Sequence, residues 1–152
     1  MVSYIPNLVE SKPVYALEET IEPLFSEKFH FVSPDTSIQK AMDLILSLSI
    51  NGLPVLDKSL HPVGFISEKD LLNQATQMLY YHGEEGKVED FMIKQCKTLH
   101  YKLSVFSAIE AFTKVWFHTY PVVDDNGKVI GTLLRKDILR AIAKTSATTW
   151  KP

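Results

Sequence analysis

The sequence has a single cysteine, Cys96, and no apolar run near the roughly 18 residues that a membrane-spanning helix needs. One cysteine cannot form a disulfide within the chain, and we interpret Cys96 as a small, half-buried thiol and not as a reactive nucleophile. The first residues lack the basic segment and the unbroken apolar segment of a secretory signal. These absences predict a cytoplasmic protein in reducing surroundings, with no membrane partner.

A basic net charge and the common catalytic motifs are also missing. The 16 Lys and Arg residues are outnumbered by 18 Asp and Glu residues, which gives a formal net charge of −2. Nucleic-acid binding needs a basic surface, so we predict no nucleic-acid partner, although a local site can still hold a small anion. The five histidines form no HExxH pair, and there is no CxxC, GxSxG or P-loop motif. We therefore predict no metal site and no catalytic residue.

What the sequence does contain is an internal repeat. An offset of 67 residues places NGLPVLDKSLHPVGFISEKDLL (51–72) on HTYPVVDDNGKVIGTLLRKDIL (118–139) without a gap, and seven of the 22 pairs are identical. Several other pairs exchange one aliphatic residue for another. Self-similarity at a fixed period indicates repeated architecture. With two copies we expect a pair packed face to face, because a unit of about 60 residues buries too little apolar surface alone.

Each copy predicts the element order β-α-β-β-α, and hence an α/β (α+β) fold with pseudo-two-fold symmetry. Apolar residues three and four apart predict amphipathic helices that begin at Ile38 and at Val105. The expected strands are 30–32, 53–57 and 62–66 in the first copy, and 97–99, 120–124 and 129–134 in the second. The closing helices are expected at 68–81 and 136–144. Strong turn residues, Asp124 to Gly127, link the last two strands of the second copy.

The same pattern divides the chain into five parts. We predict an N-terminal arm at 1–20, which includes the start of a lead-in helix over 14–25. The two repeats then occupy 21–82 and 88–145, a linker fills 83–87, and a C-terminal tail covers 146–152.

The duplicated string, GLPVLD followed by VGFISEKDLL, resembles a CBS-domain pair, also called a Bateman module. The resemblance covers about residues 21–142, and its specificity comes from two copies that agree in order and spacing. It implies a regulatory module without catalysis that binds an adenine nucleotide (AMP, ADP or ATP) or a related adenosyl ligand between the repeats. It also implies a homodimer shaped as a flat disc and a separate regulated protein.

The first copy satisfies the family's ligand motif, Gly-h-x-Ser/Thr-x-x-Asp with h apolar, in Gly64-Phe-Ile-Ser67-Glu-Lys-Asp70. A helix N-terminus attracts an anion, so the Ser67 hydroxyl can donate to a phosphate. Asp70 is suited to a ribose diol, because an ionised carboxylate only accepts hydrogen bonds. The alternative is that Ser67 and Asp70 form a capping box for the helix, and the two roles can coexist.

The second copy departs from this motif. Leu134 stands where the hydroxyl should be, so it cannot donate to a phosphate. Asp137 can still hold a ribose, and Arg135 or Lys136 can compensate through charge. Two outcomes stay open, an empty second site or one with a different phosphate placement. The alternative role of Asp137 is that of a first-turn acid matched to the helix dipole.

The walls around the base are implied by the family resemblance. In the first copy they are Phe31, Val32, Asn51, Gly52, Leu53 and Pro54; in the second they are Thr98, Leu99, His118, Thr119, Tyr120 and Pro121. Core packing is the alternative for Phe31, Leu53 and Tyr120. We interpret Trp116 and Phe117, at the end of an apolar helix, as core or dimer contacts and not as a ligand cage.

Three functions are therefore compared: a nucleotide sensor, a ligand-free dimeric scaffold, and a small enzyme acting on nucleotides. The sequence shows no paired base and nucleophile for the enzyme, which makes it the weakest of the three.

Overall fold

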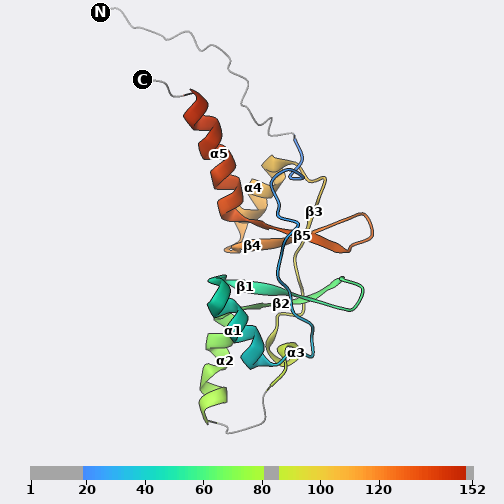
Figure 1. Ribbon diagram of the computed structural model, residues 1–152, viewed down its shortest axis with the longest axis vertical. Helices are drawn as coiled ribbons and strands as arrows, with labels where there is room; N and C mark the ends of the chain where they lie inside the picture. Colours follow the sequence, from blue (N-terminus) through green and yellow to red (C-terminus); the bar gives the residue numbers. More distant parts are fainter. Residues whose placement is uncertain (1–18, 81–85, 150–152) are drawn as a thin grey trace, which may run out of the picture.

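The computed structural model describes residues 19–80 and 86–149, which form two lobes stacked along the long axis of the molecule (Figure 1). The sheets of the two lobes face each other, and the helices extend away from the junction. The elements, in chain order, are α1 (Ile38–Leu48), β1 (Gly52–Leu56), β2 (Pro62–Ser67), α2 (Glu68–Tyr80), α3 (Val88–Phe91), β3 (Leu99–His100), α4 (Val105–Lys114), β4 (Thr119–Val123), β5 (Val129–Leu134) and α5 (Arg135–Thr149).

The two sheets repeat each other's register. β1 pairs antiparallel with β2, and β4 pairs antiparallel with β5, with Val55 opposite Gly64 and Val122 opposite Gly131. Both ladders have an irregularity one residue further on, after Val55 and after Val122. β3 runs parallel to β4, and Val32 forms the corresponding parallel bridge to Val55. The predicted repeat and the mixed α+β fold are thus confirmed.

Serine residues set the starts of the first helix in each lobe. The Ser37 side chain accepts a hydrogen bond from the backbone N–H of Lys40, and Ser104 accepts one from Ser107. Behind these caps, the predicted apolar faces are buried: Ile38, Ala41 and Ile45 belong to one core cluster, and Val105 and Ala108 to another. The periodicity in the sequence therefore locates both helices within a residue of their observed bounds.

The segments that lead into the repeats are exchanged between the lobes. Ile21, which precedes the first repeat, is buried in the core of the second lobe, and Val88 is buried in the core of the first. Five residues after each of these positions, Ser26 bridges to Thr132 of β5, and Ile93 bridges to Phe65 of β2. The chain therefore crosses the junction twice, and each lobe is completed by the other repeat's lead-in (Figure 1).

Gly64 and Gly131 allow the exchanged lead-in segments to pack closely against β2 and β5. A Cβ on Gly64 would lie 2.8 Å from the carbonyl oxygen of Ile93, and one on Gly131 would lie 2.5 Å from that of Ser26. Such distances leave no room for any side chain. The glycine of each sequence motif thus has a structural role, which is to admit the exchanged segment.

The lobes also touch at their hairpins, on the side of the molecule where both hairpins project in Figure 1. Leu56, Val123 and Val129 form a small shared cluster with Phe29 and Leu60. The Val129 N–H donates to the Leu60 carbonyl at 2.9 Å. Leu60 has a positive φ of 63°, where the second repeat has Gly127 at 76°. This contact holds one edge of the junction.

Some predicted elements differ from the structure. Residues 30–32 contribute one bridge and no full strand, and α5 begins at Arg135 and reaches Thr149. The predicted last residue of α2, 81, lies outside the described residues. Of the predicted lead-in helix, 14–18 lie outside the described residues, and 19–25 form a bridge and turns. The reason is tertiary, because the Ile21 N–H donates to Leu103 of the other lobe, and Pro23 has no N–H for a helix. Within the described part of the chain, no helix is long and apolar enough to cross a membrane.

Candidate functional site at the helix N-termini

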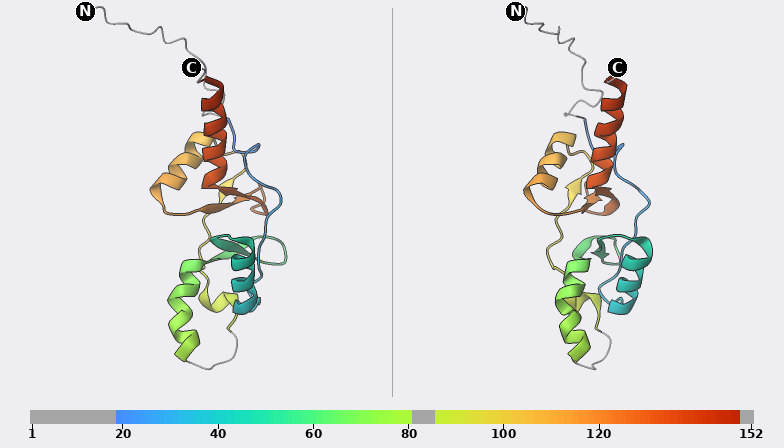
Figure 2. Two further views of the ribbon diagram at one scale, coloured as in Figure 1. Left: turned by 60° about the vertical axis from the view of Figure 1, so that its left-hand side comes forward. Right: turned by 90° about the vertical axis from the view of Figure 1, so that its left-hand side faces the viewer.

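The two closing helices begin on the same side of the molecule and run away from the junction in opposite directions. Figure 1 shows α5 rising from the upper sheet and α2 descending from the lower one, and both views of Figure 2 place the two helices in line. Each helix follows its strand without a gap, β2 into α2 and β5 into α5. The partly positive N-terminal ends of both helices therefore lie on the junction side, where an anion is favoured.

Ser67 and Asp70 form a reciprocal cap at the start of α2. The Ser67 backbone N–H and hydroxyl both donate to Oδ2 of Asp70, at 2.9 and 2.7 Å, and the Asp70 N–H donates to the Ser67 hydroxyl at 3.2 Å. The capping interpretation is thus what the structure shows. Nothing in the described residues donates to the other carboxylate oxygen of Asp70, Oδ1. The site therefore keeps one acceptor for a ligand.

The start of α5 is arranged differently. The Leu134 N–H donates to Oδ2 of Asp137 at 2.9 Å, and the Arg140 guanidinium donates to Oδ1 at 3.2 Å. Both carboxylate oxygens are engaged, and a cation compensates the charge. At the position that corresponds to Arg140, the first repeat has Asn73, and Asp70 forms no ion pair with the described residues. Asp70 is therefore the better acceptor of the two.

The residues just before β1 and β4 are hydrogen-bonded to the helix starts beside them. The Glu68 N–H donates to the Asn51 carbonyl at 3.0 Å, and the Arg135 N–H donates to the His118 carbonyl at 3.1 Å. The Arg135 side chain also contacts Nδ1 of His118 at 2.7 Å. The structure thus brings Asn51 to the α2 start and His118 to the α5 start.

Other residues in the implied walls belong to the core. Leu53, Pro54, Tyr120 and Pro121 are almost completely buried, as is Val32, and Gly52 pairs with Ser67 in the ladder. The Tyr120 hydroxyl donates to the Ala111 carbonyl at 3.1 Å, and burial raises its pKa. Side chains in these positions offer a ligand little surface. Phe31 differs, because it is 43% exposed and lies against Phe29. Thr98 is half-buried.

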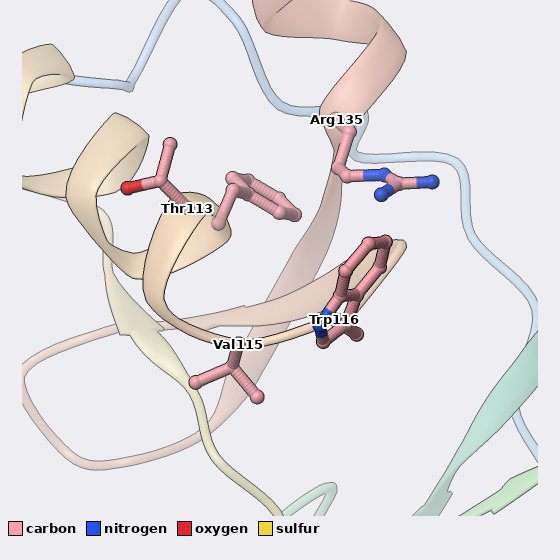
Figure 3. A pocket seen from close by; sticks show the side chains of 5 residues that line it. Thr113, Val115, Trp116 and Arg135 are labelled. Carbon is pink, nitrogen blue, oxygen red and sulfur yellow. The ribbon is translucent and has the colours of Figure 1, made fainter.

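Trp116 was interpreted as a core or dimer contact, and the structure excludes the first alternative. This residue is 91% exposed, so the core interpretation is wrong for it. It follows the end of α4 and lines an open pocket of about 120 Å³ together with Phe112, Thr113, Val115 and Arg135. Figure 3 shows the Arg135 guanidinium and the Trp116 indole beside each other, projecting from two different elements. The sequence signal available was the run of three residues with aromatic rings, Trp116 to His118, before β4.

Neither Cys96 nor the acidic residues add a further reactive or metal-binding group to the described residues. The Cys96 thiol is half-buried, as predicted, and burial raises its pKa to about 11. Over 19–80 and 86–149, no three His, Cys, Asp or Glu side chains are grouped as a metal ion would need.

Comparisons with known proteins agree with the repeat and the fold. The family model described as CBS domain matches residues 21–76 and 88–144, more than half of the chain. An inosine-5'-monophosphate dehydrogenase of Nitrosopumilus maritimus is 33% identical over 112 residues, which are 74% of this chain and 22% of that protein. The chloroplastic CBS domain-containing protein CBSX1 of Arabidopsis thaliana is 26% identical over 140 residues, covering 76% of this chain and 59% of CBSX1. This chain thus spans about a fifth of the dehydrogenase's length.

Solved structures show the same arrangement. CBSX2 in complex with AMP is 28% identical, with a TM-score of 0.72, over 84% of this chain and 98% of that one. The CBS domain pair of protein MJ0100, in complex with 5'-methylthioadenosine and S-adenosyl-L-methionine, is 25% identical, with a TM-score of 0.68, over 80% and 97%. The repeat, the fold and these matches together establish that the chain belongs to the CBS domain family.

Proposed function

We propose that this chain is a non-catalytic regulatory module that binds an adenine nucleotide of the AMP, ADP or ATP class, or a related adenosyl ligand, at the junction of its repeats. Binding would be read by a separate regulated protein. The observation that carries the proposal is the start of α2, where Asp70 keeps a free acceptor beside a helix N-terminus. Similar CBS pairs that were solved with AMP and with S-adenosyl-L-methionine support the ligand class.

The cap at α2 is compatible with ligand binding. Oδ1 of Asp70 can accept from the hydroxyls of a ribose, while Oδ2 stays bonded to the Ser67 N–H. The Ser67 hydroxyl can rotate away from Oδ2 and donate to a phosphate oxygen at the cost of one hydrogen bond. Capping and ligand recognition therefore use the same two side chains in two states.

The base is expected to lie near Asn51 and Phe31, whose side chains are exposed. The buried wall residues, Leu53, Pro54, Tyr120 and Pro121, would contribute backbone groups, as would Gly52. Val32 forms an isolated bridge to Val55 of β1, and Thr98 immediately precedes β3. His118, Arg135 and Asp137 would complete a second site at the start of α5.

Signal transmission would use the geometry of the junction. The hairpin cluster around Leu60 and Val129 and the exchanged lead-ins connect the lobes, whereas the helix starts lie on the other side in Figure 1. A ligand that bridges the helix starts would favour one tilt of the lobes. A partner that binds one tilt more tightly then responds to the ligand by population shift.

We further propose a homodimer in a reducing, cytoplasmic compartment. Leu72 on α2 and Leu139 on α5 occupy corresponding positions and are 74% and 63% exposed. Both repeats therefore present an apolar residue at the same place, which suits a surface repeated in a second copy. The single cysteine is consistent with the compartment.

Thermal unfolding with AMP, ADP, ATP and S-adenosylmethionine tests the proposal. A ligand at 100 times its dissociation constant should stabilise the fold by about 2.7 kcal/mol, which raises the melting temperature by roughly 5–10 °C for this size. Asp70→Asn should abolish most of the shift. Asp90→Asn is the matched control, because Asp90 caps α3 through the Lys87 N–H at a helix away from the α2 start. An equal ligand response in Asp70→Asn and Asp90→Asn would contradict the assigned site.

The second candidate is a ligand-free dimeric scaffold, which Leu134 and the occupied carboxylate of Asp137 favour. It predicts no thermal shift with any adenosyl compound. It also predicts that partner capture is the same with and without nucleotide.

A further inference from the structure

The end of α4 carries residues that the end of α1 lacks. Trp116 is 91% exposed and Lys114 is exposed, whereas the offset of 67 residues places Ser49 and Ser47 at these positions in the first repeat. A large exposed apolar side chain marks a site of interaction more often than a need of the fold. Because this one does not recur in the first repeat, it indicates a contact that the second repeat alone makes.

The backbone after α4 presents Trp116 to other molecules. The corresponding helix α1 ends on Ser49 in the left-handed conformation, with a φ of 52°, whereas α4 ends on Val115 in an extended conformation, with a φ of −134°. The Trp116 indole makes no ring contact or hydrogen bond within the described part of the chain. Phe117 next to it packs edge-on against Tyr120, at 5.5 Å between ring centroids. The core thus anchors the neighbour and leaves the indole outside.

The pocket beside Trp116 is small. Its volume is about 120 Å³, and its other walls are Phe112, Thr113 and Val115 at the end of α4 and Arg135 of α5 (Figure 3). Small-molecule sites usually enclose roughly 300–1,000 Å³, so this pocket is suited to one aliphatic side chain and not to a whole nucleotide. Tryptophan and arginine are also the residues enriched at the energetic centres of protein interfaces. The pocket therefore resembles the anchor point of a protein contact.

The surface next to the pocket is cationic. Lys114 immediately precedes a pocket residue, and the Lys97 ammonium lies 6.0 Å from the centre of the Phe117 ring. The one acid of α4, Glu110, is half-buried. Residues 95–149, which form most of the second lobe, contain eight Lys and Arg and four Asp and Glu, a formal sum of +4, although the whole chain has −2. An acidic partner is therefore attracted to this side of the molecule.

We propose that the end of α4, centred on Trp116, binds the regulated protein through an acidic segment that inserts one aliphatic side chain into the pocket. The indole and the pocket walls anchor that side chain, and the lysines attract the acidic residues around it. This inference rests on the proposed function, in which a separate protein responds to the ligand, and it adds where that protein binds. Arg135 lines the pocket and is also the first residue of α5, so a ligand that moves the start of α5 would change this docking surface.

A phage-displayed peptide library tests the docking surface on the full chain. Selection on the unmodified protein, with counter-selection on Trp116→Ser, should enrich peptides in which Asp or Glu flank one aliphatic residue. The strongest peptide is then labelled and titrated by fluorescence anisotropy. We expect Trp116→Ser to weaken its binding about tenfold or more, and a serine in place of the aliphatic residue of the peptide to do the same.

Charge and matched controls complete the test. Lys114→Gln should weaken binding about two- to threefold at low salt, and this difference should shrink at high salt. Leu46→Ser removes a 69% exposed apolar side chain from α1 in the other lobe, so it should change the peptide affinity less than about twofold.

The outcomes that would overturn this inference are distinct. Enriched peptides without acidic residues, or peptides that bind Trp116→Ser as tightly as the unmodified chain, refute the docking surface. An oligonucleotide that binds at Trp116 more tightly than any peptide refutes the choice of a protein partner. Self-association that Trp116→Ser abolishes would assign the surface to a second copy instead. In each case, a nucleotide-induced thermal shift that is lost in Asp70→Asn would still support the proposed function.

Discussion

Replacing Gly64 by alanine tests whether the exchanged lead-in is as close as the structure shows. The new Cβ would lie 2.8 Å from the Ile93 carbonyl oxygen, so that contact must open by about 0.6 Å to reach the 3.4 Å at which ordinary contacts begin. Ile93 and Phe65 are joined by two backbone hydrogen bonds of 3.0 and 2.9 Å. The same movement would stretch these bonds to about 3.5–3.6 Å, beyond the usual range of roughly 2.7–3.2 Å.

Two lost hydrogen bonds cost about 1 kcal/mol each, and alanine returns about 0.4–1 kcal/mol by restricting the unfolded chain. The net loss of about 1–2 kcal/mol should lower the melting temperature by roughly 2–8 °C, measured by circular dichroism. Gly131→Ala should behave in the same way, because its Cβ would meet the Ser26 carbonyl at 2.5 Å.

Gly86→Ala is the matched control. The three atoms nearest to its Cβ would be ring atoms of Phe91, which can rotate, so we expect a loss below about 1 kcal/mol. Equal stabilities of Gly64→Ala and the unmodified chain, with a greater loss in Gly86→Ala, would refute the reasoning about the exchanged segment.

Two further predictions concern single side chains. Ser67→Ala should lower the free energy of unfolding by about 1 kcal/mol, measured by chemical denaturation, because it removes the cap of α2. Leu134→Ser should raise it by a similar amount, because it creates the matching cap at α5. The opposite signs would refute the capping geometry. Cys96 should react with a thiol reagent at neutral pH roughly 100-fold more slowly than a free cysteine, because a pKa raised from 9.0 to about 11 lowers the thiolate fraction by that factor. Because its pKa is raised, the protonated thiol is favoured in the folded state, so the contribution of Cys96 to the free energy of unfolding should fall as pH rises above about 9. Cys96→Ala should remove this pH dependence.

The parts of the fold that repeat in the sequence could be predicted. Ile38, Ala41 and Ile45 are spaced for one helix face, and the turn residues Asp124 to Gly127 indicate a hairpin, so local chemistry determines these elements. The conformation of Leu60 could not be predicted in this way. Leu60 adopts the positive φ that Gly127 has in the second repeat, although leucine as a residue type does not indicate a positive φ. The tertiary contact at Val129 maintains that conformation.

The exchange of the lead-ins could not be predicted from the repeat. An offset of 67 residues is the same whether Ile21 packs on its own repeat or on the other one, so the pattern carries no information about the choice. For the candidate site, Ser67 and Asp70 were found because their spacing has chemical meaning. The core alternative for Trp116 failed because an aromatic residue after an apolar helix usually continues the core, whereas here the backbone becomes extended at Val115 and Trp116 is exposed.

The crossed lead-ins also bear on how the chain can be divided. A break between residues 80 and 86 would leave the N-terminal fragment with the edge that completes the second lobe, and the C-terminal fragment with the edge that completes the first. Each half would then lack an edge that the other half supplies, and the two together would hold the contacts of both described lobes. We therefore expect the two fragments to fold only when they are mixed, so that their reassembly reports on the junction.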